Sequence, residues 1–173
     1  MNGFVLMIPF LFIRFGLLFI VNKDAVKRAA HFPRMFGNEV YAYWIYQISN
    51  VFLFIYICFL KVIIDSSIVF YSGVVFYLSG LILCAISIIC FGIPSKNGFH
   101  CNGIYRLSRN PMYVSYFVCF IGCSLLTQSI ILCGTVVLFQ LSSHWIVLSE
   151  ERWCLREFGT TYKQYTETVR RYI

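Results

Sequence analysis

Long apolar runs, separated by short polar segments, dominate this chain of 173 residues. A helix that crosses a membrane needs about 20 mostly apolar residues. The runs at or near this length are Phe4–Val21, Tyr41–Ile64, Ile68–Ile93, Met112–Thr127 and Ile130–Leu148. Only Thr127-Gln128-Ser129 joins the last two runs, so we expect them to form a tight antiparallel hairpin. The pattern predicts an all-α polytopic membrane protein with about five transmembrane helices.

The tail that follows the last run has a different pattern. Its apolar residues recur every three or four positions: Leu155, Phe158, Tyr162, Tyr165, Val169 and Tyr172. This spacing is typical of one face of an amphipathic helix. Gly159 is expected to end one helix, and Thr161-Tyr-Lys-Gln164 is expected to open the next as a capping box. We expect a C-terminal amphipathic cytoplasmic helix, either as a surface anchor or as a lid over a site.

Composition supports a membrane protein. The chain is 60% hydrophobic and only 12% charged, about half the charged fraction of a soluble domain, and its mean hydropathy is +0.76. Little sequence remains for a soluble domain, so residues 1–173 are interpreted as a single integral membrane domain. The first apolar run is interpreted as a retained helix rather than a signal peptide, because Arg14 interrupts it and no basic segment precedes it.

The net charge of +7 is distributed unevenly between the loops. Basic residues gather in the first loop, the third loop and the tail: Lys23, Lys27, Arg28, Arg34, Lys96, Arg106, Arg109, Arg152, Arg156, Lys163, Arg170 and Arg171. This alternation follows the positive-inside rule, which places the N-terminus outside and these segments in the cytoplasm. The expected partners are therefore membrane lipids rather than nucleic acid, and the oligomeric state stays open.

The eight cysteines do not indicate a metal site or disulfides. There is no Cys-x-x-Cys pair, and most of the cysteines lie inside the expected helices, where cysteine behaves as a small apolar residue. His100-Cys101 is the one His–Cys neighbour and lacks further ligands nearby in the sequence. No metal is expected.

Three polar residues inside the apolar runs allow more than one interpretation. Gln47 and Asn50 share a helix face, and hydrogen bonding between helices is favoured over a pocket-lining role. Arg14 is costly inside a membrane unless it is paired or reaches the interface. It is interpreted either as a cation of a substrate pocket or as an interfacial anchor, and the sequence does not separate the two.

The segment Gly103–Tyr113 and the pair Glu150-Glu151 are the two polar clusters at the ends of apolar runs. Gly103 permits backbone conformations and close ligand approach that other residues resist. Pro111 suits the first turn of a helix, whose free amides bind anions. Both clusters occur where helices leave the membrane, so we expect them to form one composite site.

These clusters carry a resemblance. The pieces are Gly103-x-Tyr105, Arg109-Asn-Pro-x-Tyr113, Glu150-Glu151 and Phe158-Gly-x-x-Tyr162-x-x-Tyr165. In this order and spacing the chain resembles the isoprenylcysteine carboxyl methyltransferase family, within a wider group that includes phospholipid N-methyltransferases. The resemblance covers residues 97–172, the expected cofactor-binding part, whereas residues 1–93 fall in a region that varies with substrate in that family.

The resemblance implies a cytoplasmic site for S-adenosylmethionine. The implied cofactor-binding residues are His100, Gly103, Tyr105, Asn110, Pro111, Met112, Tyr113, Glu150 and Glu151. Amides near Pro111 could take the cofactor's carboxylate, an aromatic ring could stack on its adenine, and Glu150 could bind its ammonium or ribose. Arg109 is the candidate catalytic residue, because its guanidinium could orient an anionic acceptor or the cofactor's carboxylate.

The sequence departs from the family pattern at three positions. Asn110 occupies the usual histidine position, which removes histidine acid–base chemistry there. Ser115 replaces a small residue that is often glycine. Ile146 stands where the eukaryotic carboxyl methyltransferases have a substrate-binding arginine, which puts a carboxylate substrate in doubt.

The expected activity is methyl transfer to a lipophilic acceptor that enters from the bilayer, such as the carboxylate of a prenylated cysteine or a similar lipid-like molecule. A carboxylate is already ionised at neutral pH and needs no base. Phospholipid or amine N-methylation is an alternative, although no clear base stands out among Glu151, His144 and His100. An NADPH-dependent sterol-type reductase and a non-catalytic scaffold are further alternatives, which the glutamate pair and the dense polar site respectively disfavour.

Overall fold

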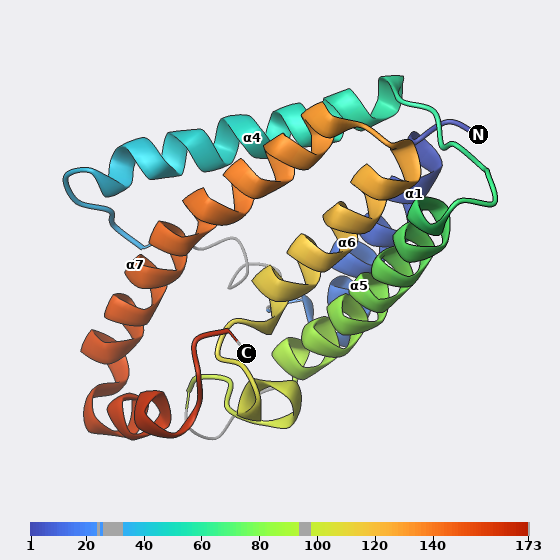
Figure 1. Ribbon diagram of the computed structural model, residues 1–173. Helices are drawn as coiled ribbons and strands as arrows, with labels where there is room; N and C mark the ends of the chain where they lie inside the picture. Colours follow the sequence, from blue (N-terminus) through green and yellow to red (C-terminus); the bar gives the residue numbers. More distant parts are fainter. Residues whose placement is uncertain (24, 26–32, 94–97, 173) are drawn as a thin grey trace.

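The computed structural model describes residues 1–23, 25, 33–93 and 98–172, and these residues are almost entirely helical (Figure 1). The elements in chain order are α1 (Phe4–Leu11), the π-helical η1 (Phe12–Leu17), α2 (Leu18–Val21), α4 (Glu39–Phe59), α5 (Ile68–Gly92), the 3-10 helix η2 (Gly103–Arg106), α6 (Pro111–Thr127) and α7 (Ile130–Thr168). The all-α prediction is confirmed. Lys27, Arg28, Lys96 and Asn97, which figured in the predicted loops, lie outside the described residues.

Within the described chain, four helical segments are long and apolar enough to cross a membrane: Phe4–Val21, Glu39–Phe59, Ile68–Gly92 and Ile130–Thr168. The remaining predicted span is α6, which is apolar but only 17 residues long. The chain is thus a polytopic, integral membrane protein.

Helix α4 ends earlier than its apolar run predicts. The run continues to Ile64, whereas the helix stops at Phe59. The following residues instead pair with the start of the chain: the Gly3 amide donates to the Leu60 carbonyl at 2.8 Å, and the Val62 amide donates to the Met1 carbonyl at 2.8 Å. These long-range hydrogen bonds hold the segment extended, and they were not visible in the local pattern.

Helices α5 and α6 pack side by side along their lengths (Figure 1). Their backbones approach closely at two glycines. A Cβ atom added to Gly80 would lie 2.4 Å from the Cys119 nitrogen, and one added to Gly122 would lie 2.3 Å from the Tyr77 nitrogen. Small residues of this kind let transmembrane helices gain van der Waals contact. The α5–α6 pair forms the compact side of the molecule.

Helices α6 and α7 form the predicted hairpin. Gln128 adopts the left-handed conformation with φ 48°, and the Ser129 hydroxyl caps α7 by accepting from the Leu132 amide at 3.2 Å. From this turn α7 diverges from α6 and runs alongside α4 (Figure 1). The distance between α6 and α7 therefore increases away from the hairpin turn (Figure 1).

Helix α7 continues well beyond its apolar run and bends at Gly159, whose φ of 54° and ψ of −128° are not helical. The expected break at Gly159 is confirmed. The prediction that Val169 and Tyr172 extend the amphipathic helix is wrong, because the helix ends at Thr168. The last residues turn back as an extended segment that hydrogen-bonds to the loop before α6.

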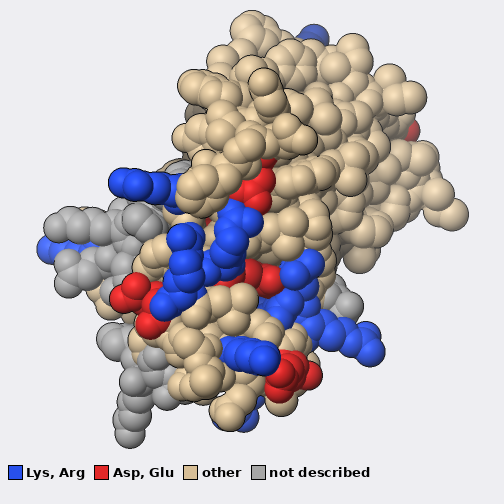
Figure 2. Space-filling view, turned by 90° about the vertical axis from the view of Figure 1, so that its left-hand side faces the viewer, with Lys and Arg blue, Asp and Glu red and all other residues tan. Residues whose placement is uncertain are grey.

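The charged side chains gather toward one end of the molecule, and most of the opposite end is free of them on the visible face (Figure 2). Across this polar end Arg152 of α7 binds Glu39 of α4 with two donors, at 2.7 and 2.6 Å. The described charges are thus concentrated at the end of the molecule at which the predicted site lies.

Candidate active site

A cavity of about 410 Å³ lies at the polar end, between η1, α4, α5, the loop before α6, α6 itself and α7. Its lining residues are Arg14, Pro33, Tyr46, Phe91, Gly98, Phe99, His100, Tyr105, Arg109, Asn110, Met112, Tyr113, Tyr116, Glu150, Glu151, Trp153, Cys154, Phe158, Tyr162 and Tyr165. The volume falls in the range of small-molecule sites, and the mixture of aromatic walls with few polar groups is typical of them.

The structure brings most of the predicted site residues together around this cavity. His100, Tyr105, Arg109, Asn110, Met112, Tyr113, Glu150 and Glu151 all line it. Gly103 and Pro111 do not. Gly103 has φ 59°, and a Cβ there would lie 2.6 Å from the Cys90 sulfur. The lack of a side chain at Gly103 therefore allows the loop to pack against α5. Pro111 is buried at the first position of α6 and fixes the start of that helix.

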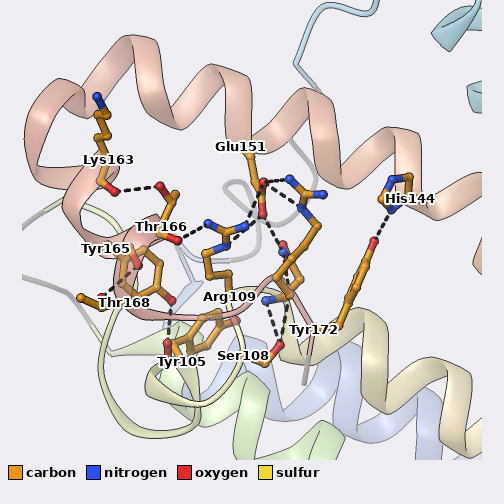
Figure 3. A network of polar contacts seen from close by, with 12 residues as sticks. Tyr105, Ser108, Arg109, His144, Glu151, Lys163, Tyr165, Thr166, Thr168 and Tyr172 are labelled. Carbon is orange, nitrogen blue, oxygen red and sulfur yellow. Dashed lines mark hydrogen bonds and ion pairs between the residues drawn. The ribbon is translucent and has the colours of Figure 1, made fainter.

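Glu151 lies at the centre of a polar network (Figure 3). We call it the Glu151 cluster, and its members are Arg109, Asn110, Glu151 and Arg171. Arg109 Nε lies 3.2 Å from Oε1, and Arg171 Nη2 lies 2.9 Å from Oε2. Asn110 Nδ2 donates to Oε1 at 3.3 Å. The side chains of Arg109 and Glu151 are each 9% exposed. The carboxylate is therefore shared between two guanidinium groups and an amide.

The C-terminal segment is fastened to the loop before α6 through the same cluster. The Arg109 amide donates to the Arg170 carbonyl at 2.9 Å, and Asn110 Nδ2 donates to the Arg171 carbonyl at 3.2 Å. Arg109 Nη1 also donates to the Thr166 carbonyl at 3.1 Å. These bonds explain why the chain leaves helical geometry after Thr168. Asn110, which cannot titrate, supplies structural hydrogen bonds here.

The amides near Pro111 are only partly available to a ligand. The Arg109 amide is taken by Arg170, and the Asn110 amide donates to the Ser108 hydroxyl at 3.2 Å. Pro111 has no amide hydrogen. Met112 and Tyr113, in the first turn of α6, keep amides without a partner among the described residues. A helix N-terminus of this kind favours an anion.

Glu150 differs from its neighbour Glu151. Its carboxylate accepts a hydrogen bond from the Tyr113 hydroxyl at 2.9 Å and makes no ion pair within the described chain. Glu150 therefore remains able to bind a cationic or hydroxyl group of a ligand, whereas Glu151 is committed to the protein.

Tyr105 presents an unusual hydroxyl group. The residue is 5% exposed and lines the cavity, yet its hydroxyl has no hydrogen-bond partner in the described part of the chain. Burial raises the pKa of this phenol well above its ordinary value, so it stays a donor. The backbone around it is fixed, because the Tyr165 hydroxyl donates to the Tyr105 carbonyl at 2.6 Å. A buried polar atom left unsatisfied calls for a partner from a ligand or water.

Sequence reasoning missed much of the opposite wall. Tyr46 of α4 and Tyr116 of α6 line the cavity, and so does Arg14 of η1, whose pocket role was left open. Tyr116 follows Tyr113 by three positions and therefore shares its helix face, which was an available signal. Tyr46 was masked by its place in an aromatic cluster that suited the headgroup region.

The other polar predictions have mixed outcomes. The hydrogen bond of Gln47 is to Tyr43 in the same helix, at 3.0 Å, and does not join two helices. His144 Nδ1 lies 2.9 Å from the Tyr172 hydroxyl and is outside the cavity lining. Ile146 is fully buried in the apolar core. No cluster of metal-ligating side chains occurs among the described residues.

A match to a protein-family model shows to which family this chain is related. The sequence model of the phospholipid methyltransferase family matches residues 68–161, which is more than half of the chain. The chain belongs to the phospholipid methyltransferase family. In this family member the match begins at α5, before the motifs described above, and ends within α7. Searches of curated proteins and of solved structures gave no match.

The residues around the cavity fit the methyl donor that a methyltransferase uses. S-adenosylmethionine has an ammonium, a carboxylate, ribose hydroxyls and an aromatic base. The cavity offers the Glu150 carboxylate, the first amides of α6 and the Tyr105 hydroxyl, which has no partner among the residues that the structure describes. Its aromatic walls suit a base and a sulfonium. The family is thus consistent with the chemistry of this cavity.

Proposed function

We propose that this protein uses S-adenosylmethionine to methylate a lipophilic acceptor that enters the cavity from the bilayer. The observation that carries the proposal is one cavity bounded both by the motif residues Tyr105, Tyr113 and Glu150 and by an apolar, aromatic wall. The motif side would hold the donor and the aromatic side the acceptor. Bound there, the donor would supply an electrophilic methyl group.

The protein's own residues would mainly bind, orient and exclude water. Glu150 and the Tyr105 hydroxyl would fix polar groups of the donor, and the C-terminal segment would close the polar end. Arg109 donates from Nη1 to the Thr166 carbonyl and from Nη2 to Glu151, and its Nε lies 3.2 Å from the same carboxylate. We therefore propose that Arg109 positions the C-terminal segment, and its predicted direct role toward an anionic acceptor stays a prediction. Positioning in a dry site accounts for a large share of such catalysis.

The favoured acceptor is a carboxylate of the isoprenylcysteine type, because such an acceptor needs no base. Phospholipid amine methylation is the second candidate, and the family match is compatible with both acceptors. An amine must lose a proton. Glu151 is held in two ion pairs and His144 lies outside the lining, so Glu150 or His100 would have to accept that proton. The family match also counts against a reductase.

A methyl-transfer assay tests the proposal. The full chain in proteoliposomes would receive S-adenosylmethionine with a labelled methyl group and either a prenylated cysteine or phosphatidylethanolamine. Label that alkali releases as methanol identifies a methyl ester, whereas alkali-stable label identifies an N-methyl group. Arg109→Ala should abolish transfer. Binding of NADPH without binding of labelled S-adenosylmethionine would contradict the proposal, and so would transfer to neither acceptor class.

A further inference from the structure

Arg14 is a charged residue inside the first membrane-spanning segment, and the proposed function assigns it no role. It belongs to the π-helical turn η1 in the middle of Phe4–Val21. Single π-turns inside α-helices are rare and often occur at functional sites. The widened turn carries Arg14 at the cavity wall, on the side formed by the N-terminal helices.

The contacts of Arg14 differ from those of the other arginines at the polar end. Arg109, Arg152 and Arg171 each pair with a carboxylate. The guanidinium of Arg14 instead lies over two aromatic rings, at 5.6 Å from the Phe15 centroid and 5.7 Å from the Tyr116 centroid. Among the described residues it has neither an ion pair nor a hydrogen bond with another side chain.

An unpaired guanidinium at this depth is expensive, and the two rings offset only part of the desolvation. Arg14 lines the cavity, so a ligand bound there can reach it. Glu150 lines the same cavity, but it accepts a hydrogen bond from Tyr113 and forms no ion pair with Arg14 within the described chain. The charge of Arg14 therefore needs an anion from outside the protein. A ligand that enters from the bilayer would carry this anion on an apolar chain.

We propose that Arg14 binds the anionic group, a carboxylate or a phosphate, of the lipophilic acceptor. The inference rests on the proposed function, which supplies the acceptor. A guanidinium can hold either anion with two parallel hydrogen bonds, and Tyr46 and Tyr116 beside it provide an aromatic surface for the adjoining carbon chain. The acceptor class is therefore an anionic amphiphile rather than a neutral lipid.

The first experiment measures binding without catalysis. Trp153 lines the cavity, so a bromine-labelled ligand bound there should quench its fluorescence once Trp44 and Trp145 are replaced by Phe. The probes are a bromine-labelled alkyl carboxylate, the matching alkyl phosphate and the matching neutral alcohol, all added to the full chain in detergent. Arg14→Met should weaken binding of the carboxylate, the phosphate or both by about tenfold, and leave the alcohol unchanged. Arg14→Lys should recover part of the loss.

The control is Lys23→Met, because Lys23 is a cation just beyond the same segment that lies over the Phe19 ring and does not line the cavity. It should leave all three probes unchanged. The carboxylate and phosphate arms show which anion the site prefers. Equal binding of all probes to the wild type and to Arg14→Met would overturn the inference and leave Arg14 as an interfacial anchor.

The second experiment separates this inference from the proposed function. Arg14→Met should raise the KM for the methylated acceptor by about tenfold while the Kd of labelled S-adenosylmethionine stays within about twofold. An equal loss in both quantities would instead make Arg14 a counter-charge to Glu150 in the donor site, against the inference. Arg14-dependent binding of anionic probes in a protein that transfers no methyl group would refute the proposed function and keep the anion site.

Discussion

Helix α6 meets its two neighbours by different means. Along α5 it is held by close backbone contact at Gly80 and Gly122, where no side chain could fit between the helices. Toward α7 it is joined by the hairpin turn at one end and by the Phe120–Phe139 ring contact. At the other end, near the cavity, the Tyr113–Glu150 hydrogen bond and the Glu151 cluster connect the two elements. Close backbone packing therefore fixes the α5–α6 scaffold, whereas polar contacts close the site.

The largest effect on stability is expected for Gly122→Ala. The added Cβ would lie 2.3 Å from the Tyr77 backbone nitrogen, so the two helices would have to separate. We expect a loss of more than about 4 kcal/mol, seen as failure to recover folded protein in detergent. Gly134→Ala is the matched control, because a Cβ on Gly134 meets no atom within 4 Å and Ala favours a helix. Normal folding of Gly122→Ala would contradict the close approach.

The second, smaller effect is expected for Glu151→Gln. The substitution removes the charge that Arg109 and Arg171 share in a site where the carboxylate is 9% exposed. Stability should fall by about 2–3 kcal/mol, and the residues from 160 to 172 should exchange amide hydrogens faster while α5 and α6 stay protected. Thermal unfolding and hydrogen exchange measure the two effects.

Arg152→Gln provides the control for that prediction. It also removes an ion pair on α7, but the Arg152 side chain is 41% exposed, so the cost should stay below about 1 kcal/mol. Equal losses in the two variants, or unchanged exchange in the tail of Glu151→Gln, would show that the Glu151 cluster does not fasten the C-terminal segment.

The difference between the two sides of α6 also explains what the sequence could predict. The apolar runs predict the ends of α5 and α6 to within one residue of the observed ends. The starts of both helices have local signals, Ser67 as the N-cap of α5 and Pro111 in the first turn of α6. The end of α4 was missed, since it depends on pairing with the N-terminus. The continuation of α7 was missed as well, because a change from apolar to polar residues does not by itself end a helix.

The site divides in the same way. The motif resemblance identified the residues contributed by the loop before α6 and by Glu150-Glu151, which are close in sequence to recognisable turns. It could not assign Tyr46 or Arg14 to the same cavity, because their helices reach it through tertiary packing. It also could not show that Glu151 forms an ion pair with Arg171, because Arg171 reaches Glu151 only when the C-terminal segment folds back.

The smallest effect on stability is expected for Tyr105→Phe, because this substitution alters neither the α5–α6 packing nor the Glu151 cluster. The Tyr105 hydroxyl has no partner in the described chain, so its removal should leave thermal unfolding unchanged. If the hydroxyl binds the methyl donor, the Kd of labelled S-adenosylmethionine should rise by about threefold to tenfold, which corresponds to the loss of one hydrogen bond.

Tyr165→Phe is the control, because it deletes a 2.6 Å hydrogen bond to the Tyr105 carbonyl and should lower stability by about 1 kcal/mol. A destabilised Tyr105→Phe with normal donor affinity would assign the hydroxyl to the scaffold, and the polar end of the cavity would then need another group to bind the donor.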